Sequence, residues 1–419
     1  MTFPIVTIGE VAKVKGGKRL PQGKLVQDEP TAHPYIRVVD FRDDGLERSN
    51  IKYIDEEAFS KVHRYTISHD DVFISIAGTV GRVGIIPKDL SGANLTENAA
   101  KICDLSARLN NKFLTYFLRS HSGQAQISAL TGGTSQPKLA LFKIEQIQVP
   151  VPLPTTQRKI AAVLSAYDDL IENNTRRIQI LEEMAQALYR EWFVHFRFPG
   201  REQSNMVESE MGLVPEGWTV KPLSWFGNIV TGKTPSKEES RYFGSDVPFI
   251  KTPDMHNRLF CIETGEELSF EGAASQKNKY IPANSICVSC IGTAGVVALT
   301  MCDCQTNQQI NSIVPSLLVF REFLYFALVG LREKINLYGS NGATMVNLNK
   351  GKFQALEVVV PPTVVLEQYH AFSFPIFNQI KGLQEKNRNL RISRDLLLPK
   401  LISGEVDVAD LDIAMGEPS

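Results

Sequence analysis

The stretch PYIRVVDF at residues 34–41 decides the fold, because a variant of it returns as PFIKTPDM at residues 248–255. A proline, an aromatic residue, an isoleucine, a cation and an aspartate keep their places in both copies. ISIAGTVGRV at 74–83 returns as VSCIGTAGVV at 288–297 with the same spacing. Separate stretches that repeat at one spacing indicate a tandem duplication.

The similarity between the two copies extends to a helix and a loop further on. KFLTYFL at 112–118 pairs with EFLYFAL at 322–328, and TGGTSQPKL at 131–139 pairs with SNGATMVNL at 340–348. Each copy thus combines short β-branched segments, a Gly-Thr-x-Gly turn, a short amphipathic helix and a Gly-rich loop. This order predicts two compact, irregular α+β domains.

Each copy is followed by a segment whose apolar residues have the 4-3-4-3 spacing of a heptad seam. The first seam has one polar member and consists of Ile160, Leu164, Tyr167, Ile171, Asn174, Ile178, Leu181, Ala185, Leu188 and Trp192. The second has two polar members and consists of Ile376, Ile380, Leu383, Asn387, Leu390, Arg394, Leu397 and Leu401. We therefore expect α+β domains at 1–152 and 211–362, with helical spacers at 153–198 and 363–405.

An antiparallel pairing of the two seams as a coiled coil places Asn174 opposite Asn387. Facing asparagines exchange amide hydrogen bonds and fix the register, whereas one asparagine among leucines has no partner. Tyr167 then faces Arg394, which favours a cation–π contact. The other predicted pairs are Ile160 with Leu401, Leu164 with Leu397, Ile171 with Leu390, Ile178 with Leu383 and Leu181 with Ile380. The alternative is that each helix packs only on its own domain.

Two prolines interrupt the pattern of the second helix. Pro375 lies one residue before the seam, so residues 363–374 are predicted to form a separate or kinked helix. Pro399 is expected to disturb the last turn of the second helix. In the first helix, residues 160–188 span about 43 Å at ~1.5 Å per residue. This length resembles one turn of B-DNA, roughly 34–36 Å.

The composition is that of a globular protein, because 43% of the 419 residues are apolar and 22% are charged. The first residues lack the features of a signal peptide, and the apolar run at 323–331 is too short to span a membrane, so we expect a cytoplasmic protein. The net charge of −1 provides no global attraction for nucleic acid. Any DNA binding must therefore come from local clusters of Lys and Arg. The six cysteines are expected to be reduced thiols.

The stretch GNIVTGKT at 227–234 matches the phosphate-binding pattern G-x-x-x-x-G-K-[ST]. The duplication argues against that function, because Gly227 and Thr234 fall on Ala12 and Arg19 in the first copy. A phosphate loop also needs a buried strand before it and a helix after it, which this stretch lacks in the sequence. A basic turn near DNA phosphates is the preferred interpretation. The alternative is an NTPase that uses Gly232, Lys233 and Thr234.

Four cysteines form a C-x-x-C…C-x-C cluster that suits tetrahedral zinc, namely Cys287, Cys290, Cys302 and Cys304. Cys287 and Cys290 align with Phe73 and Ile76, which are simply apolar. Residues three apart on a strand also face opposite sides of a sheet, so the two thiols could not share a metal without a turn. Buried thiols and no metal site are predicted.

Signatures of catalysis are missing from the sequence. There is no Asn-Pro-Pro-aromatic string of a methyltransferase, and the histidines are scattered rather than set in a hydrolase pattern. The series Gly78, Gly81 and Gly84 lacks the closer glycine pair of a dinucleotide loop, so we interpret it as tight turns. No catalytic residue and no cofactor are predicted.

The chain resembles the specificity subunit of a type I restriction-modification system over essentially its whole length. The strings that carry the resemblance are ALYREWFVHFRFPG at 187–200, LLLPKLISGEVDV at 396–408 and PLPTTQRKIA at 152–161, together with the GTVG and GTAG turns. The start of the second helix, PPTVVLEQYHAF at 361–372, is a looser version of its counterpart. This difference leaves its docking contacts open.

The resemblance implies a non-catalytic subunit with two target-recognition domains. Each would read one half of a split, double-stranded DNA target, and antiparallel helices would hold the domains apart. The helices would also dock two methyltransferase subunits, and restriction and translocase subunits would join the complex. A scaffold without base readout is a second alternative.

Reading two different half-sites requires different side chains on one scaffold, so the candidates are loop cations and amides that differ between the copies. In the first domain they are Lys18, Arg19, Arg37, Arg82, Gln136 and Lys138. In the second they are Lys233, Lys251, Lys277, Asn347, Asn349 and Lys350. An aromatic cluster would either dock partners or cap the core of the chain itself, and consists of Trp192, Phe193, Phe196 and Phe198.

Overall fold

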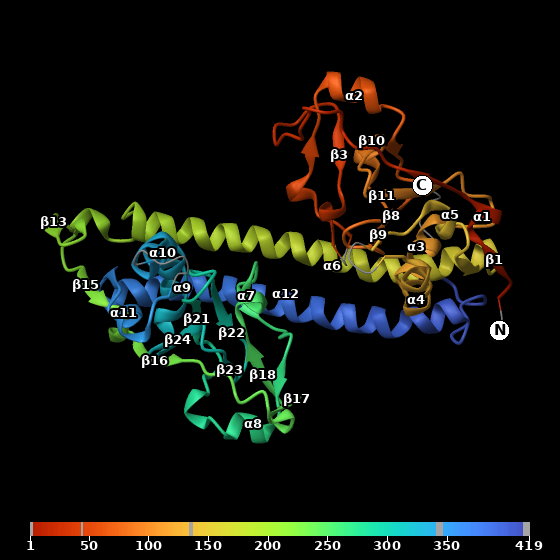
Figure 1. Cartoon of the computed structure of the whole chain (residues 1–419). Helices are drawn as coiled ribbons and strands as arrows, with labels where there is room; N and C mark the ends of the chain where they lie inside the picture. The colour runs from red at the N-terminus through yellow and green to blue at the C-terminus, as the bar shows by residue number, and fades with distance from the viewer. Residues whose placement is uncertain (1–2, 43–44, 134–136, 341–346, 414–419) are drawn as a thin grey trace. The chain divides into compact units, whose positions relative to one another are not determined.

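The computed structural model describes residues 3–42, 45–133, 137–340 and 347–413 (Figure 1). The chain divides into two compact units, one of residues 1–172 with 388–419 and the other of residues 173–387. The boundary falls inside two long helices, α6 (Pro154–Tyr189) and α12 (Thr363–Ser403). Each unit therefore contains one repeat and a part of both helices.

The first unit contains two four-stranded sheets. One is antiparallel, with the order β2 (Lys13–Gly16), β11 (Ala99–Cys103), β8 (Val72–Ser75) and β9 (Val83–Gly84). The other has the order β6 (Lys52–Tyr53), β3 (Pro34–Ile36), β10 (Ala93–Leu95) and β7 (Thr66–Ile67), in which β10 is parallel to β3. A further pair, β1 (Ile5–Thr7) with β12 (Gln148–Pro150), joins the two ends of the repeat.

Helices cover the sheets of the first unit where the sequence is amphipathic. The predicted helix is α3 (Asn111–Arg119), which buries its apolar face against the antiparallel sheet and begins at the capping side chain of Asn110. The others are α1 (Ile8–Val11), α2 (Glu56–Val62), α4 (His121–Leu130) and α5 (Leu141–Ile144). A short hairpin of β4 (Phe41–Arg42) and β5 (Gly45–Leu46) completes the unit.

The second unit repeats this topology with different edge strands. Its main sheet has the order β16 (Gly227–Thr231), β24 (Ile310–Pro315), β21 (Ile286–Ser289), β22 (Val297–Thr300) and β19 (Phe260–Cys261). Its smaller sheet has the order β17 (Phe243–Gly244), β20 (Glu267–Leu268), β18 (Val247–Ile250) and β23 (Gln305–Thr306). Because β18 is parallel to β23 as β3 is to β10, the tandem α+β duplication is confirmed.

The remaining elements of the second unit also have counterparts or connect the parts. Two strands pair the ends of the repeat, β15 (Thr219–Pro222) and β25 (Glu357–Val360). The helices are α7 (Thr252–Met255), α8 (Phe270–Ala274), α9 (Arg321–Gly330), α10 (Arg332–Ser340) and α11 (Lys350–Gln354). A hairpin of β13 (Met206–Ser209) and β14 (Gly212–Pro215) precedes the repeat.

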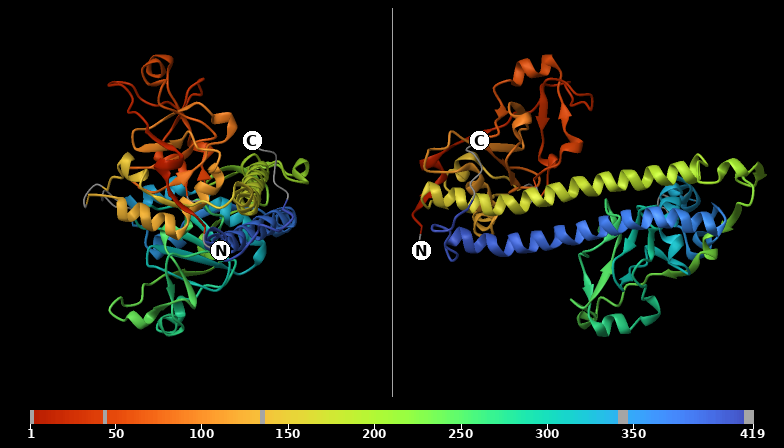
Figure 2. Two further views of the ribbon diagram at one scale, coloured as in Figure 1. Left: turned by 90° about the vertical axis from the view of Figure 1, so that its right-hand side faces the viewer. Right: turned by 180° about the vertical axis from the view of Figure 1, so that it is seen from behind.

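The long helices run antiparallel in each unit, as predicted (Figure 2). In the first unit, Ile160 and Leu164 of α6 share a core cluster with Leu401 of α12 and with the α+β domain. In the second unit, Leu181 of α6 and Ile380 of α12 belong to the core of that domain. Each helix therefore packs both on its partner and on a domain. No helix within the described ranges is long and apolar enough to cross a membrane.

Of the two outcomes predicted for residues 363–374, a separate or a kinked helix, the separate helix is wrong, because α12 is continuous from Thr363 to Ser403 and also includes Pro399. A proline removes one backbone hydrogen bond of the helix. Here Tyr369 and Phe377, on either side of Pro375, are fully buried in the core of the second unit. Tertiary packing of an apolar face supplies most of a helix's stability and outweighs the local loss.

The aromatic cluster after α6 belongs to the core. Trp192, Phe193 and Phe198 are buried in the main cluster of the second unit, and Phe196 packs edge-on against Trp218. The interpretation as an outward docking face is therefore wrong.

Candidate nucleic-acid interface

A frame of backbone hydrogen bonds holds the loop after β2 against the loop between β10 and β11. Gly17 N–H donates to the carbonyl of Ala99 at 3.0 Å, and Lys18 N–H donates to the carbonyl of Leu95 at 2.9 Å. A third segment joins this frame, because Thr96 N–H donates to the carbonyl of Ile36 at 3.0 Å. Three segments distant in sequence thus form one surface.

The second unit repeats the same frame after β16. Gly232 N–H donates to the carbonyl of Ile310 at 3.1 Å, and Lys233 N–H donates to that of Thr306 at 2.9 Å. Asn307 N–H completes it by donating to the carbonyl of Ile250 at 3.1 Å. These bonds fix which positions of the two loops correspond.

The glycine of each Gly-Lys pair is required by close packing of this frame. A Cβ on Gly17 would lie 2.0 Å from the carbonyl oxygen of Thr96, and one on Gly232 would lie 2.2 Å from that of Asn307. After β16 the chain continues as a loop to a single 3-10 turn at Ser240–Tyr242, where a phosphate loop needs a helix. The match to the NTPase pattern therefore comes from strand packing, and the NTPase alternative is not favoured.

The side chains on the first frame are polar and partly exposed. Arg19 Nε donates to Glu97 Oε1 at 2.9 Å, and the Lys18 ammonium lies 5.7 Å from the ring centroid of Tyr65. Partial burial alone would raise the pKa of Glu97, but hydrogen bonds, including that from Arg19, lower it below its usual value. A surface pocket of about 330 Å³ opens here, lined by Arg19, Leu20, Tyr35, Arg37, Val38, Val39, Thr96, Glu97 and Asn98.

The side chains on the second frame are different. Thr234 Oγ1 donates to Gln308 Oε1 at 2.6 Å, and Lys233 is exposed. Gln276 Nε2 donates to the carbonyl of Lys233 at 2.7 Å. Lys277 is exposed and directly follows Gln276 in the sequence. The structure thus brings Lys233 and Lys277 to the same region.

Two of the predicted residues, Arg37 and Lys251, bind other groups of their own unit beside the frames. Arg37 Nη2 donates to the buried Asp40 at 2.6 Å and to the carbonyl of Asn50 at 2.8 Å. Lys251 Nζ pairs with Glu266 at 2.6 Å. The backbone N–H groups of Arg37 and Lys251 also donate to Asp40 and Asp254, at 2.7 and 2.8 Å. The cation and the aspartate that both copies share therefore form an equivalent turn in each unit.

The Gly-Thr-x-Gly segments are tight turns, as predicted. Gly78 and Gly81 have φ of +77° and +90°, and Gly292 and Gly295 have φ of +75° and +80°. A serine that the sequence interpretation missed also closes each turn. Ser75 Oγ donates to the carbonyl of Thr79 at 2.5 Å, and Ser289 Oγ donates to that of Thr293 at 2.6 Å. The alignment of ISIAGT with VSCIGT already contained this signal.

Lys138 and Asn347 occupy equivalent places beside these turns. Lys138 forms a β-bridge with Ala77, and Asn347 forms one with Ile291; both side chains are exposed. The neighbouring Asn349 caps α11 by accepting the N–H of Lys352 at 2.9 Å, and Lys350 is exposed.

Two further candidates do not join the exposed group. Arg82 Nη1 donates to the carbonyls of Phe41 at 2.7 Å and Val38 at 3.2 Å, so its guanidinium is tied inside the first unit. Gln136 lies outside the described residues.

Three cysteines of the predicted cluster are buried thiols, namely Cys287, Cys290 and Cys304, but the prediction is wrong for Cys302, which is exposed in the turn before β23. Cys287 of β21 and Cys290, one residue after that strand, belong to different apolar clusters, as expected for residues that face opposite sides of the sheet. Burial raises the pKa of Cys287 to about 12 and that of Cys290 to about 11. Within the described parts of the chain, no three His, Cys, Asp or Glu side chains are grouped to hold a metal.

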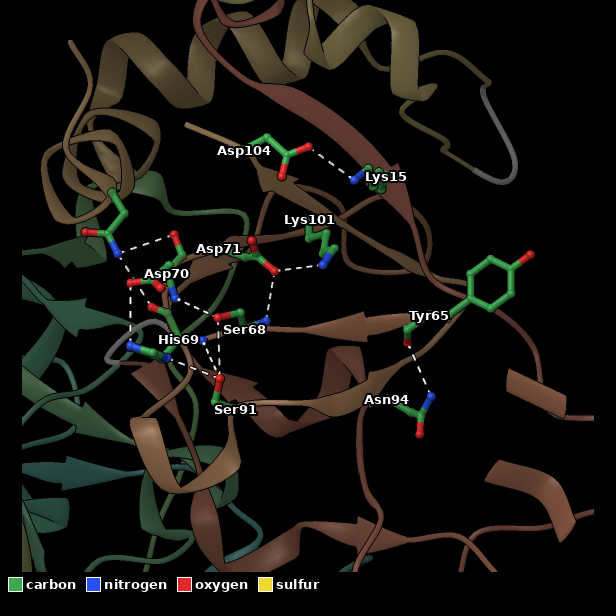
Figure 3. A network of polar contacts seen from close by, with 11 residues as sticks. Lys15, Tyr65, Ser68, His69, Asp70, Asp71, Ser91, Asn94, Lys101 and Asp104 are labelled. Carbon is green, nitrogen blue, oxygen red and sulfur yellow. Dashed lines mark hydrogen bonds and ion pairs between the residues drawn. The ribbon is translucent and has the colours of Figure 1, made fainter. Parts of the chain in front are cut away.

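In a polar network of the first domain, a histidine contacts both a serine and an aspartate (Figure 3). His69 Nδ1 lies 3.1 Å from Ser91 Oγ, and His69 Nε2 lies 3.5 Å from Asp70 Oδ1. Ser91 Oγ also accepts the backbone N–H of His69 at 3.3 Å, and Asp71 accepts from Lys101 at 2.8 Å. These bonds stabilise a turn between strands, and the histidine binds its own sequence neighbour.

The long helices carry the predicted asparagine pair in the second unit. Asn174 Nδ2 donates to Asn387 Oδ1 at 2.9 Å, and Asn387 Nδ2 donates to Thr175 Oγ1 at 3.2 Å. In the first unit, Arg394 does not lie over Tyr167 as the pairing predicts. Its Nη1 donates to Asp168 Oδ1 at 2.6 Å instead, since a carboxylate one residue along α6 is the stronger partner.

Asp168 also ties the first domain to the helices. Tyr116 of α3 donates to Asp168 Oδ2 at 2.6 Å, and burial together with this carboxylate raises the pKa of Tyr116. Burial alone would lower the pKa of Arg394, but Asp168 and Asp395 raise it. The duplication places Phe326 and Phe377 at the positions of Tyr116 and Asp168, and their ring centroids lie 5.9 Å apart. A hydrogen bond in the first unit is thus replaced by an aromatic contact in the second.

Comparison with known proteins agrees with this architecture. The family model for the type I restriction modification DNA specificity domain matches residues 2–183 and 215–374. The HindI specificity subunit of Haemophilus influenzae is 34% identical over 328 residues, 64% of this chain and 71% of that protein. The MjaIX specificity subunit of Methanocaldococcus jannaschii is 26% identical over 305 residues, 72% of this chain and 70% of that protein.

A solved structure shares the fold. The crystal structure of the type I restriction-modification S subunit from M. genitalium aligns with a TM-score of 0.60 over 96% of each chain, at 17% identity. The family model matches both of the duplicated α+β domains, which places the chain in the class of DNA-specificity proteins. The chain belongs to the type I restriction modification DNA specificity domain family, and it is a specificity subunit that recognises a DNA target.

Proposed function

We propose that the subunit reads a bipartite double-stranded DNA target, with one half read by each repeat. The observation that supports this most strongly is the pair of equivalent backbone frames that carry different side chains, Arg19 with Glu97 in one and Thr234 with Gln308 in the other. One scaffold with two sets of base-contacting groups is what two different half-sites require.

The cations around the frames would contact phosphates and set the register on the duplex. Lys18, Lys138 and Lys350 are exposed, as are Lys233 and Lys277. Arg37, Arg82 and Lys251 hold the loops in shape, so their contribution would be indirect. With a net charge of −1, binding would depend on these local contacts and would weaken steeply with added salt.

The outer faces of the long helices would dock methyltransferase subunits. On α6, Leu170 is 53% exposed in the first unit, and Ile180 and Met184 are 56% and 53% exposed in the second. On α12, Ile392 and Leu396 are 46% and 66% exposed. Exposed apolar side chains on helices are typical of surfaces that partners cover.

Methylation and cleavage would then reside in partner subunits, with restriction and translocase subunits joining the same cytoplasmic complex. The subunit itself would contribute recognition and assembly, with no catalytic residue and no cofactor of its own.

Exchange of one domain tests this function. Residues 1–152 are replaced by the equivalent part of a relative, the complex is assembled with its methyltransferase, and the methylated motif in host DNA is sequenced. We expect one half of the motif to change while the other half stays. An unchanged motif would refute base readout and favour a pure scaffold.

A further inference from the structure

We propose that Arg19 and Gln308 are the base readers of the two frames, each oriented by a side chain from the opposite loop. Arg19, oriented by Glu97, would read a G·C pair in one half-site. Gln308, oriented by Thr234, would read an A·T pair in the other. This assignment rests on the proposed function and adds to it the residues and the bases.

The two pairs of side chains occupy equivalent positions. Arg19 follows Lys18 and Thr234 follows Lys233, whose N–H groups make the same bond in each frame. Glu97 lies two residues after Leu95 and two before Ala99, as Gln308 lies between Thr306 and Ile310. The backbone bonds on both sides therefore fix the correspondence of Glu97 with Gln308.

Arg19 has the geometry to read guanine. Its side chain is 83% exposed, and its Nε donates to Glu97 Oε1 at 2.9 Å. Within the described parts of the chain, Nη1 and Nη2 of Arg19 make no hydrogen bond, and such a fork can donate in parallel to O6 and N7 of guanine. The bond at Nε fixes the plane of the guanidinium. The side chain therefore loses less conformational entropy when it binds a base.

Gln308 has the geometry to read adenine. It is exposed, and its Oε1 accepts from Thr234 Oγ1 at 2.6 Å. A carbonyl oxygen has two lone pairs, so Oε1 can still accept from N6 of adenine while Nε2 donates to N7.

The roles of the two loops are exchanged between the units. In the first unit the reader comes from the loop after β2 and its support from the loop between β10 and β11. In the second unit the support comes from the loop after β16 and the reader from the loop between β23 and β24. One frame can therefore present either an arginine or an amide at nearly the same place.

Other polar side chains of the two surfaces are less suited to this role. The fork of Arg37 is bound to Asp40 and Asn50, and Lys251 is paired with Glu266. Lys18 and Lys233 carry compact ammonium charges. Such groups suit phosphates better than bidentate hydrogen bonding to a base edge.

The direct test uses the assembled methyltransferase complex with Arg19→Lys, which keeps the charge and loses the fork. We expect preference for G·C at one position of one half-site to fall about ten- to a hundredfold, with binding to unrelated DNA unchanged. The matched control is Arg48→Lys, because Arg48 forms an exposed pair with Asp89 at 2.9 Å in the same domain, and the motif should not change.

A transplant provides the second test. The double variant Arg19→Thr with Glu97→Gln should convert that position from G·C to A·T, and Thr234→Arg with Gln308→Glu should do the reverse in the other half. A motif that stays the same in Arg19→Lys would overturn the assignment, as would equal loss of methylation at every sequence in an intact complex. A motif without two parts would instead refute the proposed function, while a single-position effect of Arg19→Lys would remain measurable.

Discussion

Asn174 donates a hydrogen bond of 2.9 Å to Asn387, joining the two long helices inside the second unit. Asn387 is only 3% exposed. A buried amide among apolar neighbours favours the one register in which it finds a partner, since every other register leaves it unsatisfied.

Replacing one member of this pair should cost more than replacing both. Asn387→Leu leaves the amide of Asn174 without its acceptor, so we expect a loss of about 1–3 kcal/mol in urea unfolding. The double variant with Asn174→Leu should recover most of this loss, because both polar groups are gone. Losses that simply add would show that the two amides are independent.

The carboxylate of Asp168 should hold the first domain to the helices. Asp168→Ala leaves Tyr116 without this acceptor and removes one of the two carboxylates that Arg394 bonds, so we expect a loss of about 1–3 kcal/mol and faster amide hydrogen exchange in α3. Asp89→Ala removes an exposed pair in the same domain and should cost at most about 1 kcal/mol. Equal effects of the two changes would contradict a structural role for Asp168.

A methyl group on Gly232 should disrupt the second frame. Gly232→Ala places a Cβ 2.2 Å from the carbonyl oxygen of Asn307, so we expect the loops to separate and one half of the motif to be lost. Gly382→Ala is the control, because a Cβ there meets nothing within 4 Å inside α12 and should stabilise the helix by about 0.5–1 kcal/mol. An intact motif in Gly232→Ala would show that recognition does not depend on the frame.

Burial raises the pKa of Glu182 on α6 to about 7, which predicts a dependence of stability on pH. Between about pH 4.5 and 7 the folded carboxyl keeps its proton while the unfolded one has lost it, so stability falls as the pH rises. Glu182→Gln should remove this loss and be more stable than the parent above pH 7, by about 1–3 kcal/mol. The two proteins should converge below about pH 4.5, and a constant difference at all pH values would argue against titration of Glu182.

The sequence was sufficient for those features that depend on periodicity and repetition. The repeat predicts two α+β domains, and the heptad seams predict the antiparallel helices and the pairing of Asn174 with Asn387. Aligning the copies also explains the Gly-Lys turn, because Gly17 and Gly232 make the same close backbone contact.

Features that depend on which groups meet in space did not follow from the sequence. The helix continues through Pro375 because of buried neighbours, and Arg394 contacts Asp168 rather than Tyr167. Arg37 resembles a DNA-contacting cation in sequence, yet its fork binds the buried Asp40. Charge and spacing identify such residues, but competition among partners in the folded domain decides what they bind.

The most direct measurement is the position of modified bases in the DNA of a host that carries the complete system. The proposed reading of DNA by the two frames predicts a motif in two parts separated by unspecified bases, with a methylated base in each part. A single uninterrupted motif, modified in one place only, would contradict that account.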